Sequence, residues 1–226
     1  MFAQATEGRE RRAAGTSLPR HRHGAPYAAL VLRGGYEECG SAGRFRVREG
    51  DVLLHGAFDA HLDRFAAPAE ILNLPLAAPH AAMARVADLD RIARLAERDP
   101  REAAAALRED LRPAVPAAAD WPDLLAAELL RDTDCRLEAW AARHGLAQAT
   151  VSRGFARVFG VSPSAFRAEA RARRAFARVA ATAEPLAAIA AALGFADQAH
   201  MTRAVAALTG APPGRWRSNG FKTALH

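Results

Sequence analysis

Cysteine and long hydrophobic segments are scarce in this chain. Only Cys39 and Cys135 are cysteines, and they lie too far apart for a zinc-binding cluster or a disulfide framework. The sequence has no run of about eighteen apolar residues, the length that a membrane-spanning helix needs. The arginines near the N-terminus are not followed by an apolar stretch of signal-peptide length. We therefore expect a cytoplasmic protein with reduced thiols and no membrane contact.

Lysine is almost absent too, and the charge is unevenly distributed. Residues 1–131 hold 18 basic and 19 acidic side chains, whereas residues 132–226 hold 13 basic and 6 acidic ones, giving net charges of −1 and +7. A segment of net +7 attracts polyanions, because neutralising phosphates releases condensed counterions. Nearly all of its cations are arginines, which suit phosphate and guanine recognition. A biased genome explains the choice of arginine over lysine equally well, but it does not explain the uneven distribution.

The first part of the chain is rich in short segments typical of β-strands. Residues 27–32 are apolar, residues 44–48 alternate with a period of two, and residues 52–54 and 71–74 are apolar again. Glycine-containing turns separate these segments. The pattern predicts a small antiparallel β module within residues 1–80.

After this module the apolar spacing changes to that of helices. Met83 and Val86 begin a series of apolar residues three or four apart, which predicts a helix from about residue 81. Asp99 and Pro100 fit the cap and first residue of a second helix, and prolines further along the chain would end it. We expect residues 81–131 to be a helical linker.

The strongest signal in the sequence is an internal repeat. Several residues of the first copy recur fifty residues later in the second: Val151-Ser152-Arg153, Gly160, Pro163 and Phe166-Arg167 correspond to Met201-Thr202-Arg203, Gly210, Pro213 and Trp216-Arg217. In each copy a short helix must stop at a glycine, Gly145 or Gly194, before a second helix begins. A helix, a tight glycine turn and another helix form the helix-turn-helix pattern, whose second helix lies in the major groove of DNA. Two copies within a domain of net +7 predict DNA binding.

The helices of this repeat have recognisable ends. We expect the second helices near residues 148–159 and 197–209, with Asp197 as a cap. A long helix should connect the two units, with Ser162 as its cap and Pro163 at its first position. This connecting helix would set the distance between the units.

Residues 132–226 resemble the DNA-binding domain of the AraC/XylS family of transcription regulators. The segments LGFADQAHMTR (193–203) and TGAPPGRWR (209–217) carry the resemblance. Gly154 and Val205 depart from it, because the family usually has a larger apolar residue and a phenylalanine there. The resemblance implies a regulator that binds double-stranded DNA at two successive major-groove segments and contacts RNA polymerase if it is an activator. A small-molecule effector is a possible further partner.

Helical geometry indicates which side chains face DNA. If Val151 and Phe155 face the core, the other side of the helix faces the groove, as in the second unit. The predicted base-reading residues are Ala149, Ser152, Arg153, Gln198, Ala199, His200 and Arg203. Of these, Arg153 and Arg203 suit guanine and Gln198 suits adenine. The predicted phosphate contacts are Arg157, Arg171 and Thr202. The alternative for each arginine is a solvated charge or an ion pair.

His21 and His23, ahead of the first apolar strand, and His61 resemble the β-barrel of the cupin class, which AraC-type regulators often carry as a sensor domain. Two histidines at i and i+2 of a strand face the same way, and His61 could complete a three-nitrogen metal site. Cupin enzymes usually supply a glutamate a few residues after the second histidine, but Tyr27 and its neighbours stand there. We therefore favour histidines hydrogen-bonded at the barrel mouth, with no cofactor, over a divalent metal ion bound by His21, His23 and His61 or a catalytic site.

The expected fold class is α+β, a small antiparallel cupin-like β module followed by an all-α domain with two helix-turn-helix units. The apolar stripe of the helices between residues 81 and 112 fits homodimerisation, as the family resemblance suggests, and it fits packing between the domains equally. Two other functions remain open. One is a metal-dependent cupin enzyme with an accessory helical domain, and the other is a packaging protein that binds nucleic acid without sequence preference.

Overall fold

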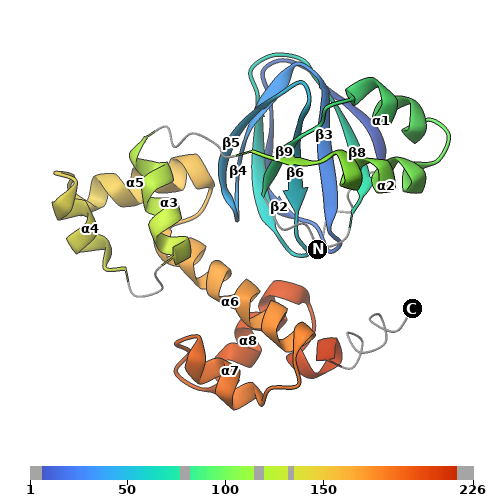
Figure 1. Cartoon of the computed structure of the whole chain (residues 1–226). Helices are drawn as coiled ribbons and strands as arrows, with labels where there is room; N and C mark the ends of the chain where they lie inside the picture. Colours follow the sequence, from blue (N-terminus) through green and yellow to red (C-terminus); the bar gives the residue numbers. More distant parts are fainter. Residues whose placement is uncertain (1–6, 77–81, 115–119, 132–134, 218–226) are drawn as a thin grey trace. The chain divides into compact units, whose positions relative to one another are not determined.

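The computed structural model describes residues 7–76, 82–114, 120–131 and 135–217. The chain divides into two compact units, of which the first contains residues 1–124 and 158–160 and the second contains residues 125–157 and 161–226 (Figure 1). The first unit is built mainly of strands and the second of helices, so the fold class is α+β, as predicted. No helix of the described residues has the length and apolar character needed to cross a bilayer.

Two antiparallel sheets form the first unit. The strands are β1 (Gly8–Arg12), β2 (Thr16–Arg22), β3 (Tyr27–Arg33), β4 (Gly35–Gly40), β5 (Gly43–Arg48), β6 (Asp51–His55), β7 (Ala60–Phe65), β8 (Ala69–Pro75), β9 (Met83–Arg85) and β10 (Arg112–Pro113). One sheet has the order β1-β8-β3-β6-β9-β10 and the other the order β2-β7-β4-β5. The four strands that the sequence predicts are all present, and strand pairs distant in sequence join them to strands that it does not reveal.

Both faces of β3 are buried, which explains its uninterrupted apolar sequence. Successive residues of a strand point to opposite faces. Ala28 and Leu30 belong to a core on one side of the sheet, whereas Ala29 and Val31 belong to a core shared with Phe65 of the second sheet. The unit therefore has one core between its sheets and another on the outer face of the larger sheet.

Two helices, α1 (Leu89–Ala96) and α2 (Pro100–Asp110), cover this outer face (Figure 1). Ile92 of α1 and Leu107 of α2 are fully buried there. Asp99 caps α2 through the backbone N–H groups of its first turn, as predicted. Both helices thus belong to the β-sheet unit, although the sequence placed them in a linker at residues 81–131.

The structure corrects the prediction that a helix begins near residue 81. Met83 lies in β9, which pairs with β6, and the backbone N–H of Val86 donates to the carbonyl oxygen of Gly50 at 3.0 Å. The first helix begins only at Leu89, after its cap Asp88. A spacing of three residues fits a helix, but it also fits a strand and a turn that lead to one. Pairing with a strand distant in sequence decides between them.

The second part of the chain is helical. Its helices are α3 (Trp121–Arg131), α4 (Leu137–Arg143), α5 (Gln148–Phe159), α6 (Pro163–Ala181), α7 (Leu186–Ala192) and α8 (Gln198–Thr209). Helices α4 and α5 form one hairpin and α7 and α8 another, with α6 between them (Figure 1). The caps Ser162 and Asp197 are confirmed, and the predicted reading helices agree with α5 and α8 to within one residue. The expected domain start at Asp132 lies outside the described residues.

Candidate functional sites

Each helical hairpin turns at a glycine. The φ angles of Gly145 and Gly194 are +65° and +69°, in the left-handed region that glycine enters with little strain. In each turn, the glycine and the residue after it donate their N–H groups to carbonyl oxygens at the end of the preceding helix. These hydrogen bonds are Gly145 to Ala142 (3.1 Å), Leu146 to Ala141 (2.9 Å), Gly194 to Ala191 (3.2 Å) and Phe195 to Ala190 (3.0 Å). The two copies of the repeat therefore have equivalent hydrogen bonds at their turns.

The repeat also includes an arginine that anchors each hairpin. Nη1 of Arg167 donates to the carbonyl oxygen of Cys135 at 2.7 Å, and Nη2 of Arg217 donates to that of Glu184 at 2.5 Å. Each acceptor lies two residues before the first helix of its hairpin. Hydrogen bonds from charged donors are stronger than neutral ones. The two arginines hold the starts of α4 and α7 in the same way.

Apolar side chains fix which face of α5 and α8 points inward. Val151 and Phe155 of α5 and Met201 and Val205 of α8 are fully buried, as predicted. The ring of Phe155 meets that of Phe166 in α6 edge to face, with centroids 5.3 Å apart. Each second helix is therefore held by its inner face against its own hairpin and α6.

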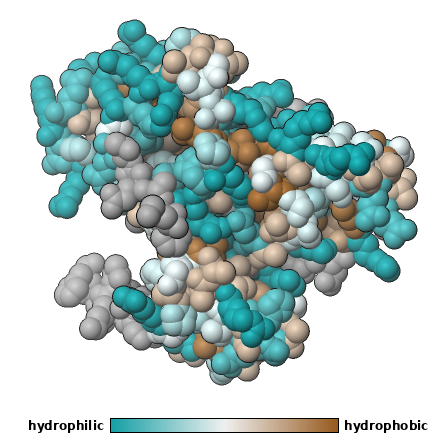
Figure 2. Space-filling model, turned by 180° about the vertical axis from the view of Figure 1, so that it is seen from behind, coloured by the Kyte–Doolittle hydropathy of each residue, from teal (hydrophilic) through white to brown (hydrophobic). Residues whose placement is uncertain are grey.

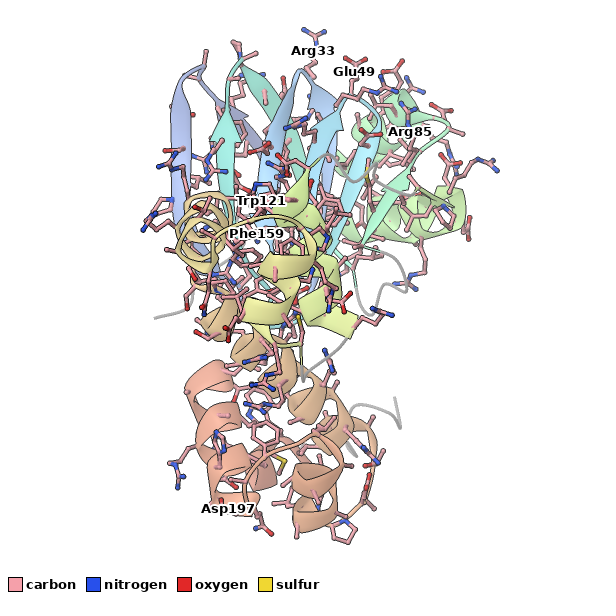
Figure 3. The ribbon with its side chains drawn as sticks, turned by 90° about the vertical axis from the view of Figure 1, so that its left-hand side faces the viewer. Arg33, Glu49, Arg85, Trp121, Phe159 and Asp197 are labelled. Atoms are coloured by element: carbon pink, nitrogen blue, oxygen red, sulfur yellow. The ribbon has the colours of Figure 1, made fainter. Side chains whose placement is uncertain are left out.

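The opposite faces of α5 and α8 carry the residues predicted to read bases. Ala149, Arg153, Gln198, Ala199 and Arg203 are exposed, and Ser152 and His200 are half-buried. Asp197 lies just before α8 (Figure 3), and its Oδ1 accepts a 2.6 Å hydrogen bond from the backbone N–H of His200. Arg153 and Arg203 occupy equivalent positions of the two hairpins. Both are accessible, as contact with a nucleic acid requires.

The predicted phosphate contacts have different surroundings. Arg157 is exposed and Thr202 is half-buried. Nη1 of Arg171 donates to the carbonyl oxygen of Gly194 at 2.9 Å, and its guanidinium lies 4.9 Å from the ring centroid of Phe195. Arg171 therefore braces the turn of the second hairpin.

In the first unit, polar side chains gather in the space between the two sheets. Tyr27 of β3, Glu38 of β4, His55 of β6 and His61 and Asp63 of β7 are all buried. Several of them line a cavity of about 100 Å³. On the face drawn in Figure 2, hydrophilic residues are interspersed with hydrophobic ones.

The structure brings the three predicted histidines together. Ring centroids are 4.9 Å apart for His21 and His23, 4.3 Å for His21 and His61, and 5.3 Å for His23 and His61. Antiparallel pairing of β2 with β7 places His21 opposite His61. One nitrogen from each of the three lies within 4.8 Å of the others. Nδ1 of His21 is 2.9 Å from the carbonyl oxygen of Pro19, which orients its ring.

Two further potential metal ligands, Glu38 and His55, were not predicted from the sequence. Together with His61 they form a second group whose donor atoms lie within 4.8 Å of one another. Oε2 of Glu38 is 3.5 Å from Nε2 of His55. A histidine at the end of the apolar segment 52–54 was the available signal for His55, whereas no local pattern marks Glu38.

Burial sets the charge of these side chains. It lowers the pKa of His55 to about 3, with further contributions from His23 and His21, and it lowers the pKa of His61 well below its usual value. Burial, followed by the nearby Asp63, raises the pKa of Glu38, and burial raises the pKa of Asp63 to about 7. The buried imidazoles are therefore neutral at pH 7, the state in which imidazole binds metals.

The cluster also contains buried polar atoms without a hydrogen-bond partner among the described residues. They are Nε2 of His55, Nδ1 of His61 and Oδ1 of Asp63. Leaving such a group unsatisfied costs roughly 1–3 kcal/mol. Two imidazoles and a carboxylate form a donor set that suits a divalent transition metal. The glutamate of cupin enzymes is absent near Tyr27, but Glu38 on β4 supplies a carboxylate to the cluster.

Comparison with known proteins bears mainly on the helical part. Residues 140–219 match the model of a family described as a helix-turn-helix domain, and no curated protein matches the chain. The C-terminal domain of AraT, a response regulator from Geobacillus stearothermophilus, is 20% identical over 43% of this chain and 84% of that chain, with a TM-score of 0.40. An AraC-type regulator from Chromobacterium violaceum is 19% identical over 42% of this chain and 88% of that chain, also with a TM-score of 0.40.

Another similar structure is an enzyme. The DMSP lyase DddQ from Ruegeria pomeroyi DSS-3 is 25% identical over 29% of this chain and 34% of that chain, with a TM-score of 0.28.

Proposed function

We propose that this chain, whose residues 140–219 are a helix-turn-helix DNA-binding domain of the AraC type, is a transcription regulator that reads two neighbouring major-groove segments. One observation carries the proposal. The two hairpins have equivalent turns and equivalent arginine anchors, and they expose Arg153 and Arg203 at equivalent positions. Because the second helix of such a hairpin enters the major groove, α5 and α8 are the reading helices.

The length of α6 supports this arrangement. Its 19 residues give a helix of about 28 Å, at 1.5 Å per residue. Successive major-groove segments on one side of a duplex are roughly 34 Å apart. A helix of this length between the hairpins suits two reading helices that enter neighbouring turns of the same duplex.

Side-chain chemistry assigns the contacts. Arg153 and Arg203 donate to O6 and N7 of guanine, and Gln198 pairs with adenine. Ala149 and Ala199 are small enough for close approach to a base edge or a thymine methyl group, while Ser152 and His200 complete the two reading surfaces. Phosphate contacts come from Arg157, Thr202 and Arg171, which position the protein on the duplex without reading its sequence.

Not all of the positive charge of residues 132–226 is available to DNA. Arg167 and Arg217 are engaged with backbone carbonyl groups, and Arg178 forms a bidentate ion pair with Glu184 at 2.6 and 2.9 Å. Binding should therefore depend on the exposed arginines, above all on Arg153 and Arg203, more than on the net charge of the domain.

Binding titrations of the full chain test the proposal. A preferred duplex is first selected from random sequences, and affinities for it and for a random duplex are then measured by fluorescence anisotropy at several salt concentrations. Arg153→Ala should cost about 1–3 kcal/mol on the selected duplex and relax one base position. Arg157→Ala should weaken binding to both duplexes alike and flatten the salt dependence.

Arg33→Ala is the matched control, because it removes the same charge from an exposed residue at one end of the β-sheet unit (Figure 3). It should leave both affinities nearly unchanged. Equal losses for Arg153→Ala on the selected and random duplexes would remove Arg153 from the reading surface. Absence of any preferred sequence would favour a packaging protein.

The buried histidine cluster favours a second candidate, a metal-dependent enzyme with an accessory helical domain. The regulator and the enzyme differ in whether the protein prefers one DNA sequence and in whether its activity needs metal. A regulator of the proposed kind prefers its selected duplex whether or not metal is present, so chelator-treated protein should retain a preference for that sequence. A protein that shows no such preference, yet turns over a substrate only when loaded with metal, would support the enzyme instead.

A further inference from the structure

Three buried side chains from three strands of the β-sheet unit meet between its sheets, namely Glu38 on β4, His55 on β6 and His61 on β7. We propose that these three residues bind one divalent transition-metal ion. The proposed site lies within the first unit and uses none of the residues assigned to DNA contact. The proposal therefore goes beyond the proposed function and is tested independently of it.

The alternation of the strands directs these side chains inward. Leu53 of β6 and Tyr36 of β4 belong to the core between the sheets, and His55 and Glu38 follow each of them by two residues. Phe65 of β7 belongs to the same core, four residues after His61. Residues an even number apart in a regular strand share a face. The backbone therefore brings all three donors into the same interior space.

Unsatisfied polar atoms point to a missing partner. Nε2 of His55 and Nδ1 of His61 are buried and have no hydrogen-bond partner among the described residues. Glu38 approaches His55 to only 3.5 Å, too far for a good hydrogen bond. His55 and His61 are respectively 5% and 3% exposed, so water does not solvate them freely. A cation held among the three residues would satisfy lone pairs that the fold otherwise buries at a cost.

The donor types select the class of ion. Calcium and magnesium prefer oxygen ligands, whereas imidazole nitrogens suit zinc, iron, copper and nickel. The buried thiol of Cys39 lies near Arg64 and Glu37, with Sγ 3.4 Å from Nη1 of Arg64, and is not part of the donor group. Two imidazoles and one carboxylate therefore indicate a divalent ion such as zinc, cobalt or iron.

A second histidine group competes for the same ion, since His21 and His23 also approach His61. Charge favours the group that contains Glu38. Three neutral imidazoles offset none of the charge of a dication, whereas Glu38 loses its proton when the ion binds and then supplies a negative charge. Glu38 is also buried, while His21 is half-buried and oriented by the carbonyl group of Pro19. The two groups share only His61, so substitutions distinguish them.

Metal titration of the full chain provides the test. Chelator-treated protein is dialysed against zinc or cobalt, and the bound metal is quantified by mass spectrometry. Wild type should bind one ion per chain. Glu38→Gln and His55→Gln should each weaken the affinity by at least about tenfold, since they remove direct ligands. His21→Gln is the matched control, because it changes a neighbouring histidine outside the proposed donor set, and its affinity should stay within about twofold of wild type.

Two results would overturn the proposal: no specific metal binding by wild type, or loss of binding in His21→Gln with binding kept in His55→Gln. Circular dichroism of the metal-free variants checks that they are folded. If the buried substitutions prevent folding, X-ray absorption of zinc-loaded wild type decides the question. Two imidazole ligands together with an oxygen ligand would support the proposed site, and three imidazoles would refute it. DNA titrations of the same samples report on the proposed function independently.

Discussion

Arginine residues of the helical domain have two physical roles. Arg167 and Arg217 donate to backbone carbonyl groups inside the domain, whereas Arg153 and Arg203 extend from exposed helix faces. In the sequence, all four arginines are parts of the same repeat. The sequence does not tell the anchoring arginines from the exposed ones, because that depends on which carbonyl groups the fold brings within reach. Net charge alone would therefore overstate the surface that DNA can contact.

Removing an anchor should affect stability, and removing an exposed arginine should not. Arg167→Ala leaves the carbonyl group of Cys135 without its charged donor, so we expect the helical unit to lose about 1.5–3 kcal/mol of unfolding free energy. Arg153→Ala should change it by less than about 0.5 kcal/mol. Urea unfolding followed by tryptophan fluorescence measures both, since Trp140 and Trp216 lie in this unit. Similar stabilities for the two variants would argue against an anchoring role for Arg167.

At the scale of elements, glycine has opposite effects at two places in the repeat. Gly194 has φ +69° in the turn between α7 and α8, whereas Gly154 lies within α5 and does not have a positive φ. A residue with a side chain is strained in the left-handed conformation of the turn. In the interior of a helix, glycine is less stable than alanine. Ala204 stands at the position of the second hairpin equivalent to Gly154 and is partly buried there.

Replacing glycine by alanine should therefore have opposite effects on the stability of the helical unit at these two positions. Gly194→Ala should destabilise the helical unit by about 1–2 kcal/mol, the strain of a left-handed residue with a side chain. Gly154→Ala should stabilise it by up to about 1 kcal/mol. Thermal unfolding monitored by circular dichroism near 222 nm compares both with wild type. Destabilisation by Gly154→Ala would mean that the added methyl group meets a neighbour that α5 cannot accommodate.

Helices were predictable here because their signals are local. The caps Ser162 and Asp197 and the turn at Gly194 act within a few residues, and each marks a helix end that the structure confirms. Strand β1 is polar in sequence, and it is a strand because it pairs with β8, some sixty residues away. The segment near Met83 was wrongly predicted as helix for the same reason.

The buried cluster shows the same division. His21, His23 and His61 could be proposed from the sequence, because His21 and His23 are two residues apart just before an apolar segment and His61 follows the turn at Gly50 and Asp51. Glu38 and His55 could not be grouped with them, since β4 and β6 lie in different sheets whose inner faces meet only in the fold. The base-reading residues remain predictions, which the binding titrations test.

At the scale of the whole molecule, the chain combines two units with different chemistry. The β-sheet unit buries imidazoles and carboxylates around a small cavity, and the helical unit exposes arginines on duplicated hairpins. The proposed binding of an ion in the first unit and the proposed binding of DNA by the second use different residues, so each can be measured separately on one sample. A ligand can alter DNA binding only if it binds the DNA-bound and free forms with different affinity.

The spacing of the two hairpins leads to a prediction about DNA geometry. If α5 and α8 enter successive major-groove segments, the two halves of the selected site must lie on the same side of the duplex. Inserting five base pairs between them rotates one half by about half a turn, since a turn holds roughly 10–10.5 base pairs. Affinity should then fall to that of a single hairpin, because α6 joins the hairpins through a continuous helix.

A double comparison isolates this effect. On the selected duplex, Arg203→Ala should weaken binding by about 1–3 kcal/mol. On the duplex with five inserted base pairs the same substitution should cost almost nothing, because α8 no longer reaches its bases. Fluorescence anisotropy of both proteins on both duplexes gives the coupling between substitution and insertion directly. Equal losses on the two duplexes would mean that the hairpins bind independently of spacing, and simultaneous reading of neighbouring grooves would then have to be abandoned.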